Sequence, residues 1–166
     1  MNAEIRISSY SPSHARAIAD LYHAAVHGID SLVYSKAQKE AWAPTPPDYT
    51  FWAKRLQDKQ PFVALVDERV AGFMELEADG HIDCAYTHPD FQGSGVASAL
   101  YQHLESQATA KGIDSLYVEA SIVAKPFFEH RDFMVLRSNK VYKKGLELIN
   151  FSMEKPLSGR QIADTF

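Results

Sequence analysis

The sequence predicts a mixed α/β domain in which helices flank one largely antiparallel β-sheet. Short segments of alternating apolar and polar residues are typical of strands, and tight-turn residues join several of these segments as hairpins. In a few other segments the apolar residues recur every three or four positions, as they do in amphipathic helices. The 166 residues match the length of one domain, and no repeat or low-complexity linker divides them.

The first third of the chain predicts one strand and three helices. Residues 4–10 alternate apolar and polar side chains, as a half-buried strand does. Three N-cap signals follow, each ahead of apolar residues at helical spacing: Ser11, Ser35 and Asp48. The first of these helices reaches residue 27, and the proline-rich segment 44–47 separates the second helix from the third.

The middle of the chain predicts an antiparallel meander and then a helix. The turn at 67–69 and the Asp79-Gly80 pair join three strands in hairpins. A glycine-containing loop then opens into an amphipathic helix that ends at Lys111-Gly112. The expected strands are 62–66, 70–77 and 81–87, and the helix starts at Val96.

The last part of the chain predicts a strand, a short helix and a final hairpin. A turn at Lys143-Lys144-Gly145 joins the hairpin strands. The expected elements are a strand at 116–120, a helix at 124–130 and hairpin strands at 133–141 and 146–153. Residues 1–155 are therefore interpreted as one domain, followed by a tail at 156–166.

Composition and charge exclude several classes of protein. Hydrophobic residues make up 46% and charged residues 23% of the chain, as in an average globular protein. The net charge of −4 argues against nucleic-acid binding, which needs a basic surface. The single cysteine, Cys84, excludes an internal disulfide framework. No metal site is predicted, because His81 and His88 fit no short zinc motif and have no cysteine partner nearby.

The sequence contains no targeting or membrane signal. The residues after Met1 alternate in polarity and lack the apolar core of a signal peptide. No apolar run approaches the roughly 18 residues of a spanning helix. We therefore expect a cytoplasmic protein with no membrane partner.

The loop between the third meander strand and the following helix is the most informative segment. It reads Gln92-Gly93-Ser94-Gly95-Val96-Ala97. Its two glycines permit a sharp turn and leave room for a ligand near the backbone. The first N–H groups of a helix have no internal partner, and with the helix dipole they favour an anion such as a phosphate. A glycine pair between a strand and a helix can also be only a tight turn.

At this loop the sequence resembles the GNAT superfamily of N-acetyltransferases. Residues 92–97 fit its Q/R-x-x-G-x-G/A pattern, and the wider segment 86–100 resembles the family's central strand, loop and helix. Residues 120–133 resemble its later strand–helix–strand corner, and the element order agrees over nearly the whole chain. The corner and the segment around Trp42 resemble the YafP-like branch of small bacterial members.

The resemblance implies a GNAT-like fold and acetyl-CoA as cofactor. The implied sheet has about seven strands, is mostly antiparallel and splays between its fourth and fifth strands. In this family, loop amides hold the pyrophosphate and the pantetheine arm lies along the central strand. The residues that the resemblance assigns to acetyl-CoA are Ala85, Tyr86, Thr87, Gln92, Gly93, Ser94, Gly95, Val96, Ala97, Ser98, Ser121, Phe127 and Phe128.

The corner departs from the family pattern at two positions. Where the family often has a tyrosine acid, this chain has Phe128, which carries no hydroxyl. Asp132 replaces the usual glycine before Phe133, and aspartate tolerates the left-handed backbone that this turn needs. Another group must therefore protonate the leaving thiolate, or the thiolate leaves without help.

Direct attack on the thioester requires a base for the amine and benefits from an acid for the thiolate. Asp83 and Glu119 lie on the two strands expected to flank the cofactor and are the candidate bases. Tyr142 in the last hairpin is the candidate acid, with Tyr86 and Tyr117 as alternatives. Solvated carboxylates and packed rings are the competing interpretations of all these residues.

Strand alternation also predicts the orientation of these side chains. It directs Asp83 to the face opposite Cys84 and Tyr86, and it places Glu119 on one face with Tyr117 and Ser121. The isolated Cys84 thiol is interpreted as a small buried apolar group.

The expected activity is transfer of an acetyl group from acetyl-CoA to a primary amine of a small molecule. Aromatic residues between Trp42 and Trp52 fall where the family shapes its acceptor pocket, which suggests an acceptor with an apolar or aromatic part. A protein or peptide acetyltransferase and a non-catalytic acyl-CoA sensor remain alternatives. The last hairpin offers an edge for a homodimer, although Lys143-Lys144 is typical of a protected edge.

Overall fold

The computed structural model describes residues 4–157 and contains one seven-stranded sheet with helices on both faces. Two short 3-10 helices, Pro12–His14 and Pro89–Phe91, precede α1 and α4. The elements in chain order are β1 (Ile5–Ser9), α1 (Ala15–His27), α2 (Lys36–Trp42), α3 (Tyr49–Lys59), β2 (Phe62–Val66), β3 (Arg69–Leu76), β4 (His81–Thr87), α4 (Val96–Ala110), β5 (Ser115–Ser121), α5 (Lys125–Glu129), β6 (Met134–Lys143) and β7 (Leu146–Pro156).

The three expected helix caps are confirmed. Ser11 and Ser35 each form a capping box, and the Asp48 side chain accepts a hydrogen bond from the Phe51 amide. The first helical segment differs in detail, because its first turn is the 3-10 helix that precedes α1. Asp132 has the positive φ of +70° that its place in the corner requires.

The sheet has the strand order β1-β2-β3-β4-β5-β7-β6. Every neighbouring pair is antiparallel except β4 and β5, which run parallel. The predicted fold class, with its mostly antiparallel sheet, is therefore confirmed.

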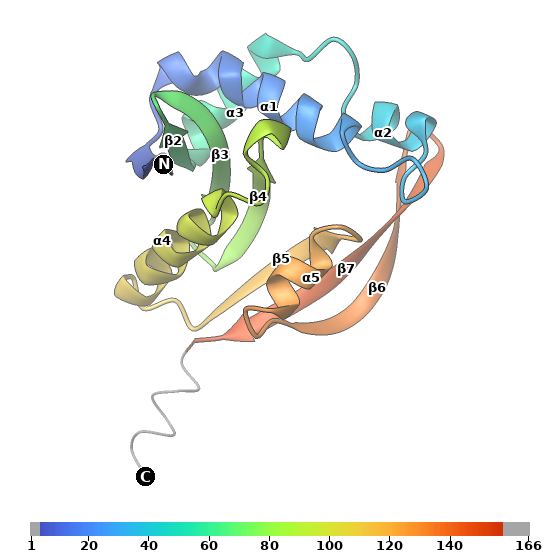
Figure 1. Ribbon diagram of the computed structural model, residues 1–166. Helices are drawn as coiled ribbons and strands as arrows, with labels where there is room; N and C mark the ends of the chain where they lie inside the picture. Colours follow the sequence, from blue (N-terminus) through green and yellow to red (C-terminus); the bar gives the residue numbers. More distant parts are fainter. Residues whose placement is uncertain (1–3, 158–166) are drawn as a thin grey trace.

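The parallel pair β4 and β5 stays together for only two register positions. His81 lies opposite Tyr117 and Ile82 lies opposite Val118, and no further pairs follow. In Figure 1 the two strands diverge from this point, so β1–β4 form one half of the sheet and β5–β7 the other. We refer to the space that begins beyond Ile82 and Val118 as the strand opening.

The helices pack on the sheet so that the strand opening stays accessible from both faces. Helix α4 covers one face of the first half, and its Leu100 and Leu104 belong to the same buried cluster as Met74 of β3. Helices α1 and α3 cover the other face through Leu21 and Leu56 (Figure 1). Burial of such side chains contributes about 1.5–3 kcal/mol each and fixes the two faces of the sheet.

A β-bulge changes the alternation in β4. Met74 pairs with Ala85 and Leu76 pairs with Ile82. Two residues of β4, Asp83 and Cys84, therefore lie opposite the single residue Glu75 of β3. Such a bulge turns consecutive side chains toward one face. Asp83 and Cys84 therefore both reach the Arg55 guanidinium on the α3 side of the sheet. The prediction that Asp83 points away from Cys84 was wrong for this reason.

The C-terminal end of the described chain is part of the domain. Pro156 is the last residue of β7, and Leu157 is buried and donates its N–H to the Asp114 carbonyl. The rest of the expected tail, residues 158–166, lies outside the described residues. In the described part of the chain, no helix is long and apolar enough to span a membrane.

Gly80 holds the register of β4 and β5, and its replacement tests that role. A Cβ there would lie 2.1 Å from the Ser115 carbonyl oxygen, whereas one at Gly112 would meet nothing within 4 Å. Both glycines have positive φ, so Gly112→Ala controls for backbone strain. We expect Gly80→Ala to lower the free energy of unfolding by about 1–3 kcal/mol more than Gly112→Ala in urea titrations. Equal losses would contradict this role.

Candidate active site

Two cavities meet at the strand opening. The larger, with a volume of about 660 Å³, is on the side of α1, α2 and α3, and the smaller, about 420 Å³, is beside the N-terminus of α4. Six residues line both cavities: Trp42, Ala85, Tyr86, Ser121, Ala124 and Phe128. The arrangement can hold one reactant from each side with their reacting groups adjacent.

The smaller cavity is formed around the predicted phosphate loop. Gly93 and Gly95 have φ of +76° and +91°, a conformation that strongly favours glycine. A Cβ at Gly93 would meet nothing within 4 Å, and one at Gly95 would meet only Ile5 Cδ1 at 3.8 Å. The glycines therefore leave space next to the loop backbone, which a ligand can fill.

The N-terminus of α4 supplies hydrogen-bond donors to this space. The N-cap residue of α4 is Gly95, so no side chain at this position accepts a hydrogen bond from the first N–H groups of the helix. Within residues 4–157, the N–H groups of Val96, Ala97 and Ser98 have no hydrogen-bond partner, whereas the Ser94 N–H donates to the Phe91 carbonyl. Because the helix is 15 residues long, its dipole adds positive potential at these donors. An anionic phosphate group fits this end of the cavity.

Arg131 is a cation near this loop that sequence reasoning missed. Its Nη2 donates to Ser98 Oγ at 2.5 Å, and its guanidinium lies 3.6 Å from the centroid of the Phe127 ring. Arg131 follows α5 and is 33 residues away from Ser98 in the chain, so no local motif pointed to it. Its charge complements the helix terminus at an anion site.

The predicted corner residues lie where the cavities join. Ser121 Oγ accepts a hydrogen bond from the Ala124 amide, and both residues line the two cavities. Phe128 is only 2% exposed and packs edge-on against Phe127 and Phe133. The ring at this position therefore fills the core below the opening and presents no proton donor.

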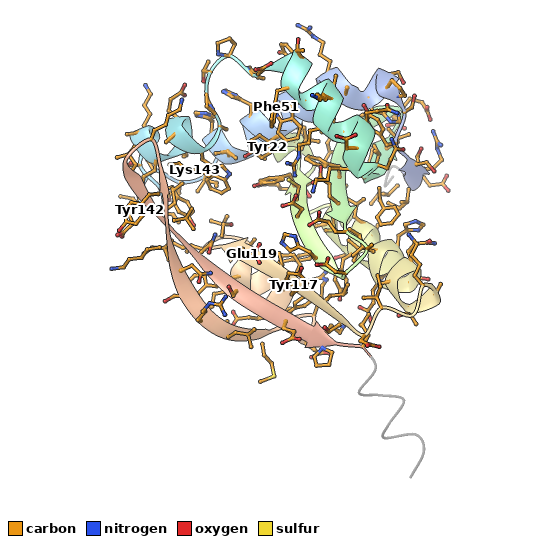
Figure 2. The ribbon with its side chains drawn as sticks, turned by 180° about the vertical axis from the view of Figure 1, so that it is seen from behind. Tyr22, Phe51, Tyr117, Glu119, Tyr142 and Lys143 are labelled. Atoms are coloured by element: carbon orange, nitrogen blue, oxygen red, sulfur yellow. The ribbon has the colours of Figure 1, made fainter. Side chains whose placement is uncertain are left out.

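Aromatic rings and prolines form one wall of the larger cavity. Hydrogen bonds attach this wall to the second half of the sheet: the Tyr34 hydroxyl donates to the Ile149 carbonyl, and Gln38 Nε2 donates to the Glu147 carbonyl. In Figure 2, Tyr22 and Phe51 lie on the helical side of the opening. The rings that line the cavity are Tyr22, Tyr34, Trp42, Phe51, Trp52, Tyr86 and Phe128.

Charged side chains meet at the floor of the larger cavity. Arg55 Nη2 donates to Glu75 at 2.7 Å and to Asp83 at 2.9 Å, and Lys59 Nζ donates to Asp83 at 2.8 Å. Glu75 is completely buried, and this burial raises its pKa despite the neighbouring Arg55. For Asp83, burial acts in the same direction, but Lys59 and Arg55 lower its pKa overall. Asp83 is therefore an anion with little tendency to take a proton.

Glu119 lies across the opening from Asp83 in a different environment. Its carboxylate is 2.7 Å from His81 Nε2, and His81 Nδ1 is 2.6 Å from Glu77 on the far side of the ring. The Glu119 side chain lines the larger cavity and is 43% exposed (Figure 2). Burial opposes protonation of His81, but its bonds to Glu77 and Glu119 raise its pKa overall.

Cys84 lines the larger cavity close to these groups, and its surroundings disfavour the reactive thiolate. Burial and the nearby Glu75 raise the pKa of the thiol well above its usual value, despite the opposite effect of Arg55. A thiol that stays protonated reacts slowly, because the thiolate is the reactive form.

The structure does not bring Tyr142 to Asp83 and Glu119. The Tyr142 side chain is 65% exposed and its hydroxyl donates to Glu147, whereas its neighbours Val141 and Lys143 line the cavity. Strand alternation in β6 accounts for this, since consecutive residues face opposite sides. Figure 2 places Tyr142 at the outer edge of the hairpin.

Tyr117 is also held away from the cavities, because its hydroxyl donates to Asp79. Of the three tyrosines considered as the acid, only Tyr86 lines the cavities.

Comparison with known proteins identifies the family. The family described as "Acetyltransferase (GNAT) domain" matches residues 31–155. The uncharacterized N-acetyltransferase YafP of Escherichia coli (strain K12) is 33% identical over 149 residues, which cover 90% of this chain and 94% of that protein.

Solved structures show the same fold. A GCN5-related N-acetyltransferase from Rhodopseudomonas palustris has a TM-score of 0.85 and 33% identity, covering 95% of this chain and 97% of that one. PaiA N-acetyltransferase from Thermoplasma acidophilum, solved with coenzyme A, has a TM-score of 0.72 and 17% identity, with coverages of 93% and 99%.

The chain belongs to the GNAT family of acetyltransferases. It is therefore an acyltransferase that takes its acetyl group from acetyl-CoA, as the resemblance implied.

The two ion-pair contacts of His81, with Glu77 and with Glu119, predict a pH-dependent contribution to the stability of the fold. A histidine whose pKa is raised by folding stabilises the fold below its unfolded pKa, and this contribution disappears as pH rises through the folded pKa. We therefore expect His81→Gln to lower the free energy of unfolding more at about pH 5.5 than at about pH 9. His130→Gln, an exposed site at the end of α5, is the control. A loss that grows with pH would contradict the assignment.

Proposed function

We propose that the chain transfers the acetyl group of acetyl-CoA to the primary amine of a small molecule that has an aromatic or apolar part. The observation that carries the proposal is the junction of the two cavities at the strand opening. One cavity leads to the uncapped N-terminus of α4, and the other is lined by aromatic rings and two carboxylates.

The smaller cavity receives acetyl-CoA. The N–H groups of Gly93 and Gly95 to Ser98 hold the pyrophosphate, and the Arg131 guanidinium adds a positive charge at the same end. Ala85, Tyr86 and Thr87 line the path toward the opening, where the thioester lies between β4 and β5. Ser121, Phe127 and Phe128 form the opposite side of this path.

The larger cavity receives the amine. Asp83 and Glu119 attract the ammonium form, and the rings of the wall pack against the rest of the acceptor. Only the neutral amine can attack the thioester carbonyl, so one proton must first leave the nitrogen. Asp83 is held as an anion by Lys59 and Arg55 and serves as an electrostatic anchor.

Glu119 is the proton acceptor of the reaction. It lines the cavity and makes its hydrogen bond to a single residue, His81, among the described residues. The nitrogen then forms a bond to the carbonyl carbon and the carbon–sulfur bond breaks. The nitrogen loses its second proton in this step and the thiolate gains one, so the products are the amide, the coenzyme A thiol and one proton on Glu119. Tyr86 is the proposed donor to the thiolate because its side chain lines both cavities. Burial raises the pKa of its hydroxyl well above the usual value, so Tyr86 donates its proton only as it takes up the second proton of the nitrogen.

A homodimer and a cytoplasmic location stay predictions. Pairing of two copies along β6 would cover exposed Met134 and Leu136 near its start. The expectation that the chain binds no nucleic acid also stays a prediction.

The function is tested by measuring coenzyme A release from acetyl-CoA with a panel of amines. We expect turnover with small aralkyl amines and little turnover with peptides or with amines that lack an apolar part. Activity confined to peptide N-termini, or no activity with any small amine at saturating acetyl-CoA, would contradict the proposed acceptor class.

Gly95→Glu tests the phosphate loop. The protein has room for a side chain at this position, but the added carboxylate would enter the proposed pyrophosphate site. We expect acetyl-CoA affinity in calorimetry to fall at least about 100-fold, which corresponds to about 2.7 kcal/mol. Gly145→Glu in the β6–β7 turn, also at positive φ, is the matched control and should bind normally. Unchanged affinity in folded Gly95→Glu would refute the loop assignment.

Glu119→Gln tests the proton acceptor. We expect kcat to fall by about 10²–10⁴ while the KM for acetyl-CoA stays close to that of the parent, because the residue acts in proton transfer. Glu68→Gln removes an exposed carboxylate that contacts Arg6 and should leave kcat unchanged. A Glu119→Gln variant with parental kcat over the whole pH range would exclude Glu119 as the base.

A further inference from the structure

Three potential metal ligands from two helices converge beside the larger cavity. His23 and His27 are four residues apart on α1, and their rings stack with centroids 4.2 Å apart. Glu40 of α2 faces them, and its Oε2 is 3.6 Å from His27 Nε2. One ligand atom from each of the three residues can be chosen so that all lie within 4.8 Å of one another.

From this convergence we infer that His23, His27 and Glu40 bind one divalent transition-metal ion, with Zn²⁺ as the best match. Two imidazole nitrogens and one carboxylate oxygen are a donor set that zinc accepts. Ligands about 2.0–2.2 Å from a tetrahedral zinc ion are about 3.4 Å apart, so the His27–Glu40 distance already fits. The ligand atom of His23 lies within 4.8 Å of the other two and must move closer to reach this separation.

The hydrogen bonds of the three side chains show what the ion would replace. His27 Nε2 donates to the Ala43 carbonyl at 2.8 Å, and His23 Nε2 is 2.7 Å from Thr45 Oγ1. The Thr45 hydroxyl donates to Glu40 Oε2 at 2.9 Å, so His23 must be the donor in its bond to Thr45. Binding through Nε2 would require each imidazole to move its proton to Nδ1, a change of tautomer that leaves the charge unaltered.

The position of the site gives it a consequence for the pocket. His23 and Ala43 both line the larger cavity, and Glu40 also holds Thr45 in the turn that follows α2. A bound ion would link α1 to α2 next to this turn and stabilise the cavity wall. This inference does not depend on the acceptor or on the acetyl-transfer chemistry.

The test is calorimetric titration of the full chain, without an affinity tag and freed of metal by a chelator, with ZnCl₂. We expect one ion per chain, and an affinity that falls at least about tenfold in His23→Gln, His27→Gln and Glu40→Gln. His103→Gln removes an imidazole that packs on Phe62 in another part of the fold and should bind zinc as the parent does. Equal affinity in all four variants, or no saturable binding by about 1 mM zinc, overturns the inference.

A second measurement does not rely on the variants being folded. Co²⁺ added to the unmodified chain should produce the intense visible absorption of a low-coordinate site, and equimolar Zn²⁺ should remove it. Absorption no stronger than that of aqueous Co²⁺ overturns the inference. Circular dichroism of each variant separates loss of a ligand from loss of the fold.

Discussion

The separation of β4 from β5 is the constraint on which the rest of this structure depends. Two paired positions hold the strands together, and beyond Ile82 and Val118 their backbones separate. Strands in a continuous sheet satisfy each other's N–H and C=O groups, so an opening inside a sheet needs other partners. The two cavities meet in this opening, which gives a thioester and an amine access from opposite faces. The glycine loop, the aromatic wall and both carboxylates all surround this one gap.

The two carboxylates beside the opening, Asp83 and Glu119, have different charged neighbours. Asp83 and Glu119 have the same chemistry in the sequence, but they have different neighbours in the fold. Two cations hold Asp83 as an anion, whereas Glu119 contacts an imidazole that is itself bonded to Glu77. A carboxylate with two cationic partners is a poor proton acceptor, which leaves Glu119 as the base in the proposed reaction.

The sequence predicted most of the fold because local signals were strong at nearly every boundary. Caps at Ser35 and Asp48 and the turn at Gly80 fixed element limits to within a residue or two. The orientation of Asp83 could not be predicted, because the bulge opposite Glu75 depends on pairing between strands. The position of Tyr142 could not be predicted either, because the sequence does not show which face of β6 meets the cavity. Arg131 reaches Ser98 only through a tertiary contact. Local periodicity contains none of this information.

We infer that the reaction takes place where the two cavities meet. A crystal structure of the chain with acetyl-CoA and an unreactive amine analogue tests it most directly. We expect the pyrophosphate at the N–H groups of Val96 to Ser98, the acetyl group between β4 and β5, and the analogue nitrogen next to Glu119. A pyrophosphate bound away from α4, or an acetyl group outside the strand opening, would contradict it.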